Sequence, residues 1–253
     1  MIVGTGKEAA VSKLGFLFVL CVSAAGQDSA LDLFHRMQRA LGGAEKIAGV
    51  RDFDQSVTAR AWRSNGEAMG EVRKHTRWVR PNYLRLDQVG PGDTYVLCFD
   101  GTSGWEILPD GREADLSGGE LEFAKRYLSG FALNVWLADS GAGYKISSPA
   151  PNVVRVAENR AGNWQVDITL DPSTFLPLKE ASISLADPAR PVANETQFRE
   201  WMMVQGIRFP KRIWVLHNGV KLADITTEEI KLNTGIQPHE LAGKPAGLKP
   251  VMR

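Results

Sequence analysis

Cysteine is scarce in this chain of 253 residues, and its scarcity excludes a disulfide-stabilised protein. The only two cysteines are Cys21 and Cys98. Because Cys21 lies in a segment that we expect to be removed, Cys98 would remain alone and no internal disulfide could form. Val96, Leu97 and Phe99 surround Cys98 in the sequence, which favours a buried, inert thiol over a reactive nucleophile.

Signatures of metal binding and catalysis are also lacking. The pair His239-Glu240 has no second histidine at the spacing of a zinc hydrolase, and Gly101–Gly104 does not fit the turn that carries a hydrolase nucleophile. No metal-ligand spacing links the four histidines, which are His35, His75, His217 and His239. We therefore expect no metal, no cofactor and no catalytic residues, although a hydrolase site assembled from dispersed residues stays open.

Net charge is nearly absent. The chain has 30 basic and 29 acidic residues, and the expected removal of residues 1–25 deletes Lys7, Lys13 and Glu8, which leaves 28 of each sign. A neutral chain has no basic field to attract phosphate groups. Nucleic acid and anionic membrane surfaces are therefore poor candidates as partners.

No apolar run is long enough for a typical membrane span, which needs roughly 18 residues. Residues 1–25 instead have the order of a secretory signal: basic Lys7 and Lys13, apolar 14–22, and the small residues 23–25. The alternative is a membrane anchor. Leu20 precedes Cys21 where a lipoprotein signal needs a small residue, so we expect export by the ordinary route, cleavage, and one domain over residues 26–253.

The segment from Trp164 to Leu232 predicts five consecutive antiparallel strands. Trp164, Val166 and Ile168 alternate with polar residues, as expected for a sheet with one dry face, and Ala181 and Ile183 continue the same alternation. Asn218-Gly219 and other turn signals separate the strands, which are expected at 164–172, 178–186, 195–205, 207–217 and 220–232. An antiparallel sheet of this length needs cover on its apolar face.

The first half of the chain predicts a helix over 28–41, a short helix over 44–48 and a second series of strands. These strands are expected at 52–63, 67–80, 83–89, 94–99 and 105–108, and two more at 144–148 and 153–158. We expect about ten or eleven antiparallel strands in all. The tail, 238–253, contains three prolines and is expected to be irregular.

One conspicuous helix is predicted over Gly119–Asp139, between the two series of strands. Its charged residues are confined to the first half, whereas Phe131–Ala138 is apolar nearly all round. Gly130 in the middle indicates a kink or a break. We expect this helix to cover the concave face of the sheet, with Leu128, Phe131, Val135 and Trp136 facing Trp164, Val166 and Ile168.

Seven tryptophans support the same interpretation. Each alone suits ordinary core packing, but together with an apolar helix they favour a wide cavity over a filled interior. The residues expected to line the cavity and its lid are Trp62, Trp105, Leu128, Phe131, Val135, Trp136, Trp164, Val166, Ile168 and Ile183.

Four short segments carry a resemblance to a known family. They are Arg39–Gly43 at a helix end, Phe99–Trp105 between two strands, Leu170–Leu178, and Gly206–Pro210 on a late hairpin. In these segments the chain resembles LolA and its relatives, the periplasmic carriers of outer-membrane lipoproteins. The resemblance implies a mostly β (α+β) fold. In it, a single strongly curved antiparallel sheet forms an open half-barrel, and an N-terminal helix and a helical lid close an apolar cup that holds acyl chains.

Three functions follow as hypotheses. The first is a monomeric periplasmic carrier or sensor that binds lipid or lipoprotein acyl chains without catalysis, with an envelope membrane protein as a second candidate partner. The second is a secreted hydrolase whose site is assembled from dispersed residues. The third is a structural or interaction module of the envelope, in which side chains fill the cup. A measured cavity volume distinguishes the first from the third, and a cluster of titratable groups with shifted pKa in a cleft would favour the second.

Overall fold

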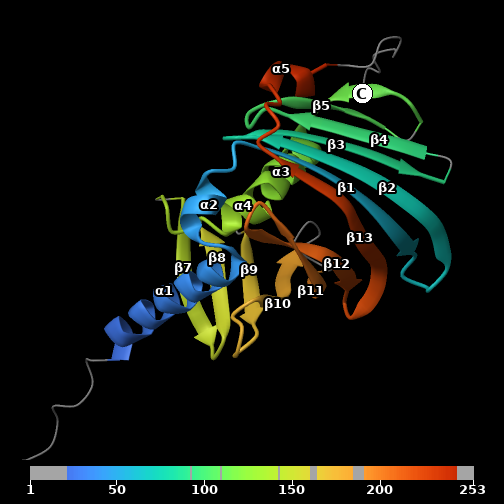
Figure 1. Cartoon of the computed structure of the whole chain (residues 1–253). Helices are drawn as coiled ribbons and strands as arrows, with labels where there is room; N and C mark the ends of the chain where they lie inside the picture. The colour runs from blue at the N-terminus through green and yellow to red at the C-terminus, as the bar shows by residue number, and fades with distance from the viewer. Residues whose placement is uncertain are drawn as a thin grey trace, which may run out of the picture.

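Thirteen antiparallel strands form one strongly curved sheet that does not close into a barrel (Figure 1). The computed structural model describes residues 22–91, 93–108, 110–141, 143–159, 164–184 and 191–243. The first six strands are β1 (Asp52–Trp62), β2 (Ala68–Val79), β3 (Tyr83–Gly90), β4 (Asp93–Phe99), β5 (Gly104–Ile107) and β6 (Glu113–Asp115). The other seven are β7 (Tyr144–Ala150), β8 (Val153–Glu158), β9 (Gln165–Leu170), β10 (Pro177–Ser184), β11 (Val192–Val204), β12 (Ile207–His217) and β13 (Val220–Leu232).

Five helices accompany the sheet among the described residues. They are α1 (Val22–Leu41), α2 (Ala44–Ala48), α3 (Gly118–Ser129), α4 (Ala132–Val135) and α5 (Pro238–Leu241). Buried side chains of α1, α3 and α4 belong to the same apolar cluster as those of β1, β2, β9 and β12, so these three helices lie on the concave side. α5 lies near β3, on the opposite side of the sheet (Figure 1).

Strand order explains why a helix must cross the mouth of the sheet. Within β1–β6 and within β7–β13, each strand pairs with the next one in sequence, and the two series are joined by β1 and β13. The two edges of the sheet are therefore β6 and β7, which are consecutive in the chain. The connection between them contains α3 and α4, so it spans the open side from one edge to the other.

The join between the two series is secured by a buried carboxylate. Asp52, at the start of β1, is only 4% exposed. It accepts hydrogen bonds from the backbone N–H groups of Thr234 and Gly235, at 2.7 and 2.9 Å, just after β13 ends. The start of β1 is thus bonded to the end of β13 by charge-assisted hydrogen bonds.

Two of the segments that carry the family resemblance meet each other in space. Gly42, after α1, has a φ of 128°, and a Cβ built on it would lie 2.3 Å from the backbone oxygen of Gly206. Arg208 also donates a hydrogen bond to the backbone oxygen of Ala40. A glycine is therefore required where the end of α1 packs against the β11–β12 hairpin.

Most expected elements are confirmed, including the hairpin at Asn218-Gly219, where both residues have positive φ as a tight hairpin turn requires. The predicted helix over 119–139 is interrupted at Gly130, which separates α3 from α4. The expected total of about ten or eleven strands was too low, since the described residues form thirteen, of which twelve lie at the expected ranges and one was missed. The missed strand β6 has three residues, which is too short for a period of two to be visible in the sequence.

The ends of the chain fall partly outside the described residues, including 1–21 of the expected signal and 244–253 of the tail. α1 begins at Val22, six residues before the helix start expected from the sequence. The described part of the tail contains the short helix α5. Among the helices that are described, none is both long and apolar enough to cross a membrane.

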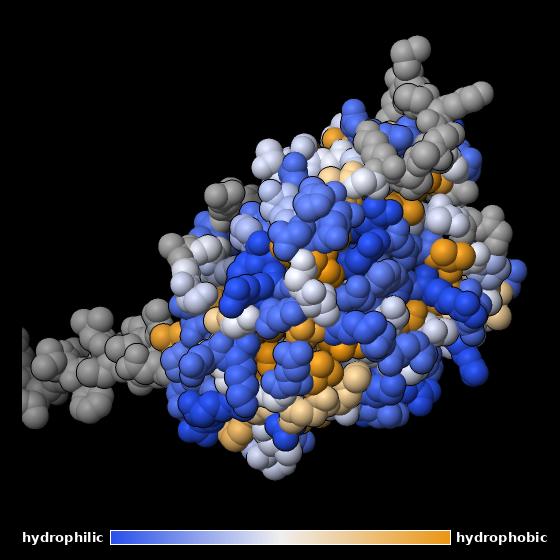
Figure 2. Space-filling model, turned by 45° about the horizontal axis from the view of Figure 1, so that its top comes forward, coloured by the Kyte–Doolittle hydropathy of each residue, from blue (hydrophilic) through white to orange (hydrophobic). Residues whose placement is uncertain are grey.

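Buried side chains form one large apolar cluster on the concave side and a small one on the other side. The small cluster consists of Val96, Cys98, Trp105 and Ile107. Burial raises the pKa of Cys98 to about 11, as expected for an inert thiol. On the face seen in Figure 2 most of the surface is hydrophilic, and hydrophobic side chains show mainly in the hollows between hydrophilic ones.

Candidate functional site

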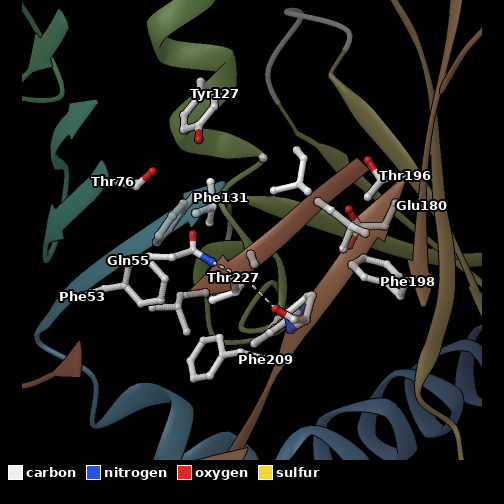
Figure 3. Close-up of a pocket in the computed structure, with 18 of the residues that line it drawn as sticks. Phe53, Gln55, Thr76, Tyr127, Phe131, Glu180, Thr196, Phe198, Phe209 and Thr227 are labelled. Atoms are coloured by element: carbon white, nitrogen blue, oxygen red, sulfur yellow. Dashed lines mark hydrogen bonds between the residues drawn. The ribbon is translucent and has the colours of Figure 1, made fainter. Parts of the chain in front are cut away.

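A cavity of about 470 Å³ lies between the lid helices and the concave face of the sheet. This volume is within the range of about 300–1,000 Å³ that is usual for small-molecule sites. Figure 3 shows Tyr127 and Phe131 on the lid side, with strand residues around them. The residues that line it are Phe53, Gln55, Val57, Lys74, Thr76, Arg126, Tyr127, Gly130, Phe131, Ala132, Leu133, Trp136, Trp164, Glu180, Thr196, Phe198, Phe209, Pro210, Ile213, Ile225 and Thr227. We call this cavity the cup.

Aromatic rings join the lid to the walls of the cup. The ring of Phe131 lies 5.4 Å from that of Phe53 on β1 and 5.4 Å from that of Trp78 on β2, measured between ring centroids. The Trp136 ring lies 5.7 Å from that of Phe209 on β12. Contacts of this kind contribute about 0.5–1.5 kcal/mol each beyond the area they bury. The break at Gly130 makes them possible, because Phe131 has extended backbone and its side chain need not follow the face of α3.

The C-terminal part of the lid is anchored by α1. Gln38 is 3% exposed, and its side-chain amide donates to the backbone oxygen of Trp136 at 2.9 Å and to Asp139 Oδ1 at 2.8 Å. The hydroxyl of Tyr144 on β7 donates to the backbone oxygen of Ser129 at 3.2 Å. These bonds hold α4 and the end of α3 in place, since a buried amide that lost its partners would be costly.

A lysine of the sheet contacts the lid beside the cup. Lys74 on β2 donates a hydrogen bond to the Tyr127 hydroxyl at 2.8 Å and lies 4.8 Å from the centre of its ring. Phe123, one turn earlier in α3, is 48% exposed. Lys74 thus bonds the middle of the lid to β2, whereas the outer side of α3 at Phe123 faces solvent.

The floor of the cup contains a short polar chain. Gln55 donates to Thr227 Oγ1 at 3.3 Å, and that hydroxyl donates to the backbone oxygen of Pro210 at 2.8 Å (Figure 3). Hydrogen bonds within the protein thus satisfy these groups in part. Their presence means that the cup is apolar but not uniformly so.

Glu180 is the unusual residue of the site. It lies on β10 beside Thr196 and Phe198 of β11, on the wall of the cup (Figure 3). Among the described residues, none forms a hydrogen bond or an ion pair with its carboxyl group. Burial raises the pKa of Glu180 to about 7, because an ionised carboxylate is poorly solvated there.

Seven of the ten residues expected from the sequence lie at or directly behind the cup. Phe131, Trp136 and Trp164 line it. Leu128, Val135, Val166 and Ile168 are buried in the large apolar cluster that supports its lid and wall. The buried lid residues and those of β9 belong to one apolar cluster, and the ring contacts of Phe131 and Trp136 are with β1, β2 and β12.

Trp105 and Trp62 lie elsewhere. Trp105 belongs to the small cluster with Cys98, and alternation along β4 places that cluster on the face away from the cup. Trp62 is at the end of β1, where the ammonium group of Lys221 lies 5.0 Å from its ring. That lysine also lies 4.2 Å from the ring of Trp214, so these two tryptophans share a cation rather than a cavity.

Ile183 lies on the side of β10 opposite to the one expected. It is 63% exposed, whereas Glu180, three residues earlier, lines the cup. The β9–β10 register shifts between Pro177 and Lys179. A one-residue shift moves every following side chain to the other face. The polar positions of β10 therefore face inward, and the apolar position Ile183 faces solvent.

Several residues of the cup were missed by reasoning from the sequence. Gln55 falls at a dry position of β1, between Phe53 and Val57, and this polar break in the alternation was a usable signal. Phe209 and Pro210 lie within one of the segments that carry the family resemblance. Glu180 had no such signal, because the bulge that turns it inward has no mark in the sequence.

The described residues contain no group of three or more histidine, cysteine, aspartate or glutamate side chains arranged to hold a metal ion. The described residues that line the cup include neither histidine nor cysteine. The arrangement as a whole is an apolar chamber with one titratable carboxyl group, two nearby cations (Lys74 and Arg126) and a few hydroxyls.

Comparisons with known proteins find similarity in structure alone. Neither a family model nor a curated protein matches the sequence. A LolA superfamily protein from Nitrosomonas europaea superposes with a TM-score of 0.57 at 16% identity, covering 82% of this chain and 97% of that one. A DUF1329 family protein from Desulfovibrio piger gives 0.56 at 12% identity, with 85% and 97% covered.

A third solved structure is a domain from Vibrio parahaemolyticus described as an outer membrane lipoprotein-sorting protein domain. It gives a TM-score of 0.54 at 13% identity and covers 85% of this chain and 97% of that one. At identities this low the comparison concerns the fold, not the activity. With its open curved sheet and a lid between the two edge strands, the chain has a LolA-like fold.

Proposed function

We propose that this protein is a periplasmic carrier or sensor that binds a lipidic ligand in the cup without catalysis. The observation that supports it is the cup itself, about 470 Å³ of mostly apolar space between a lid and a curved sheet. A structural module of the envelope would be expected to fill this space with its own side chains.

Burial of acyl chains would provide the binding free energy. Each methylene removed from water contributes about 0.8 kcal/mol, so a long acyl chain supplies on the order of 10 kcal/mol before the costs of ordering it. The acyl chain would contact Phe131, Trp136 and Trp164. Behind these residues lie Leu128, Val135, Val166 and Ile168, which would support the contacts. Entry and release would require movement of the lid.

The nature of the cargo is proposed from the same fold in other proteins. One structural relative is described as an outer membrane lipoprotein-sorting domain, which supports lipoprotein acyl chains or free lipid as cargo and the periplasm as the compartment. An envelope membrane protein that delivers or receives the cargo is part of this proposal.

The hydrolase hypothesis has one observation in its favour, the shifted pKa of Glu180. A general acid or base needs a nucleophile or a second titratable group within hydrogen-bonding reach. No histidine or cysteine is among the described residues that line the cup, and these residues bring no partner to the Glu180 carboxyl group. The carrier is therefore the better-supported proposal.

Native mass spectrometry of the protein purified from its source tests the proposal. We expect an additional mass corresponding to bound lipid, which disappears after extraction with organic solvent and returns on incubation with lipid. The added mass would itself identify the class of cargo. Protein that carries no lipid, and that does not take up an apolar fluorescent dye when purified, would refute the proposal.

Export is proposed on the sequence of residues 1–25. Cleavage there would shorten the first turn of α1 and leave its buried residues in place, since those described are Ala30, Phe34, Met37, Gln38 and Leu41. We expect N-terminal sequencing of the exported protein to begin near Gly26, with residues 26–253 forming one domain. A mature protein that begins at Met1 would contradict this prediction.

A further inference from the structure

The cup continues into a second, polar pocket. This pocket has a volume of about 160 Å³ and is lined by Val166, Ser182 and Asn194 together with four residues that also line the cup. The four shared residues are Gly130, Trp164, Glu180 and Thr196. We call this space the side pocket. Because its lining overlaps that of the cup, one ligand could occupy both.

Strand pairing explains why the side pocket is polar. Glu180 is directly opposite Thr196, and Ser182 is directly opposite Asn194, on the neighbouring strands β10 and β11. Residues two apart on a strand, and their opposite partners, share one face of a sheet. The register shift at Pro177 turns this face inward, so four polar side chains form one patch beside the apolar cup.

The Glu180 carboxyl group is left without a partner in this patch. Among the described residues, none donates a hydrogen bond to it or forms an ion pair with it. Glu180 is half-buried, and a carboxyl group that loses part of its contact with water is normally bonded to protein or to ordered water. A ligand that supplies the missing hydrogen bond would gain affinity because it provides this partner.

Charges around the two spaces limit the head group that would fit. Among the described residues no cation lines the side pocket, so an anionic head group would meet only the Glu180 carboxyl group there. Lys74 and Arg126 line the adjoining cup, and they disfavour a cationic head group that passes them. The other polar lining groups are hydroxyls and an amide, which both donate and accept hydrogen bonds.

We propose that the side pocket receives an uncharged, hydroxyl-bearing head group, with Glu180 as its main hydrogen-bond partner, while the attached acyl chain occupies the cup. This inference rests on the proposed function, because it requires a lipid in the cup. The pKa of Glu180, raised to about 7, is consistent with a carboxyl group that can also donate a hydrogen bond.

Competition between matched lipids tests the inference. The full chain, freed of lipid, is loaded with the apolar dye N-phenylnaphthylamine, which has no hydroxyl head group and reports on the cup alone. A monoacylglycerol and the methyl ester of the same fatty acid then displace the dye. We expect the monoacylglycerol to bind about fivefold to tenfold more tightly, which is the contribution of one or two hydrogen bonds.

Two variants locate the preference. Glu180→Leu should abolish the preference for the monoacylglycerol over the methyl ester, while the dye still binds. Glu200→Leu is the matched control and should preserve it, because Glu200 is exposed and contacts Arg212 rather than the side pocket. If Glu180→Leu does not take up the dye, Thr196→Val serves instead and should reduce the preference about twofold to threefold.

The outcomes separate the two proposals. If the wild-type chain binds neither dye nor lipid, the proposed function fails. If it binds both, but the monoacylglycerol and the methyl ester compete equally or the preference survives in Glu180→Leu, only the inference about the side pocket fails. A stronger competition by a long-chain alkylamine or alkyl phosphate than by the monoacylglycerol would also overturn it, since the head group would then be charged.

Discussion

Replacing Phe131 with aspartate is expected to lower the affinity for a fluorescent fatty acid by about tenfold or more while the chain remains folded. Phe131 lines the cup and packs against the rings of Phe53 and Trp78. An aspartate would lose both ring contacts and place a charge in an apolar chamber, where ionisation is costly. The loss of packing is about 2–4 kcal/mol, below the 5–15 kcal/mol that stabilises a typical domain.

Two controls make the result specific. Phe131→Leu keeps the apolar character and should reduce affinity only slightly. Met203→Asp introduces the same charge on β11, where Met203 is 56% exposed and does not line the cup, and should leave binding unchanged. Fluorescence titration and urea unfolding measure the two properties separately. Unfolding of Phe131→Asp would mean that the lid is part of a solid core, and unchanged binding would mean that the lid does not cover the ligand site.

Replacing Glu180 with glutamine is expected to stabilise the lipid-free protein at pH 8 and to have little effect at pH 4. Burial raises the pKa of Glu180 from about 4.5 to about 7. The folded protein therefore holds this proton more tightly than the unfolded chain, so the wild-type free energy of unfolding falls as pH rises between these two values and levels off above pH 7. A shift of this size corresponds to about 3–4 kcal/mol at most, and because Glu180 is only half-buried we expect about 1–3 kcal/mol.

The measurement is urea unfolding of both proteins across this pH range. Glutamine keeps the shape of glutamate but carries no charge, so the difference between the two curves should grow through the window and then become constant. For Glu200→Gln, at an exposed position on β11, the difference in free energy of unfolding from wild type should not change between pH 4.5 and pH 7. A difference that is the same at pH 4 and pH 8 would show that Glu180 does not titrate within this window.

Local patterns in the sequence were sufficient for the strands and their hairpins. Alternation and turn residues predicted twelve of the strands within a few residues, because a strand with one dry face leaves a period of two in the sequence. Gly130 correctly marked the break in the lid, since glycine weakens a helix wherever it falls. Glu113–Asp115 was missed because a strand of three residues has no period to detect.

Which residues line the cup depends on contacts between residues that are distant in sequence. Phe131 and Trp136, which the apolar pattern of their helix singled out, line the cup. Trp105 is equally apolar and is also buried, but it lies on the other face of the sheet. Hydropathy distinguishes buried from exposed residues, and it does not distinguish the two sides of a sheet when both carry a cluster.

The sequence by itself determined the mostly β fold, the succession of strands along the chain and the position of an apolar helical segment between two series of hairpins. These features follow from local periodicity and turn chemistry. Only the tertiary structure decided that β1 pairs with β13, that the lid therefore bridges the two edges of the sheet, and that Glu180 rather than Ile183 faces the cup. The physical reason is register. A bulge at one position of β10 reverses every side chain after it, and such a bulge is set by packing between strands and not by the residues within one.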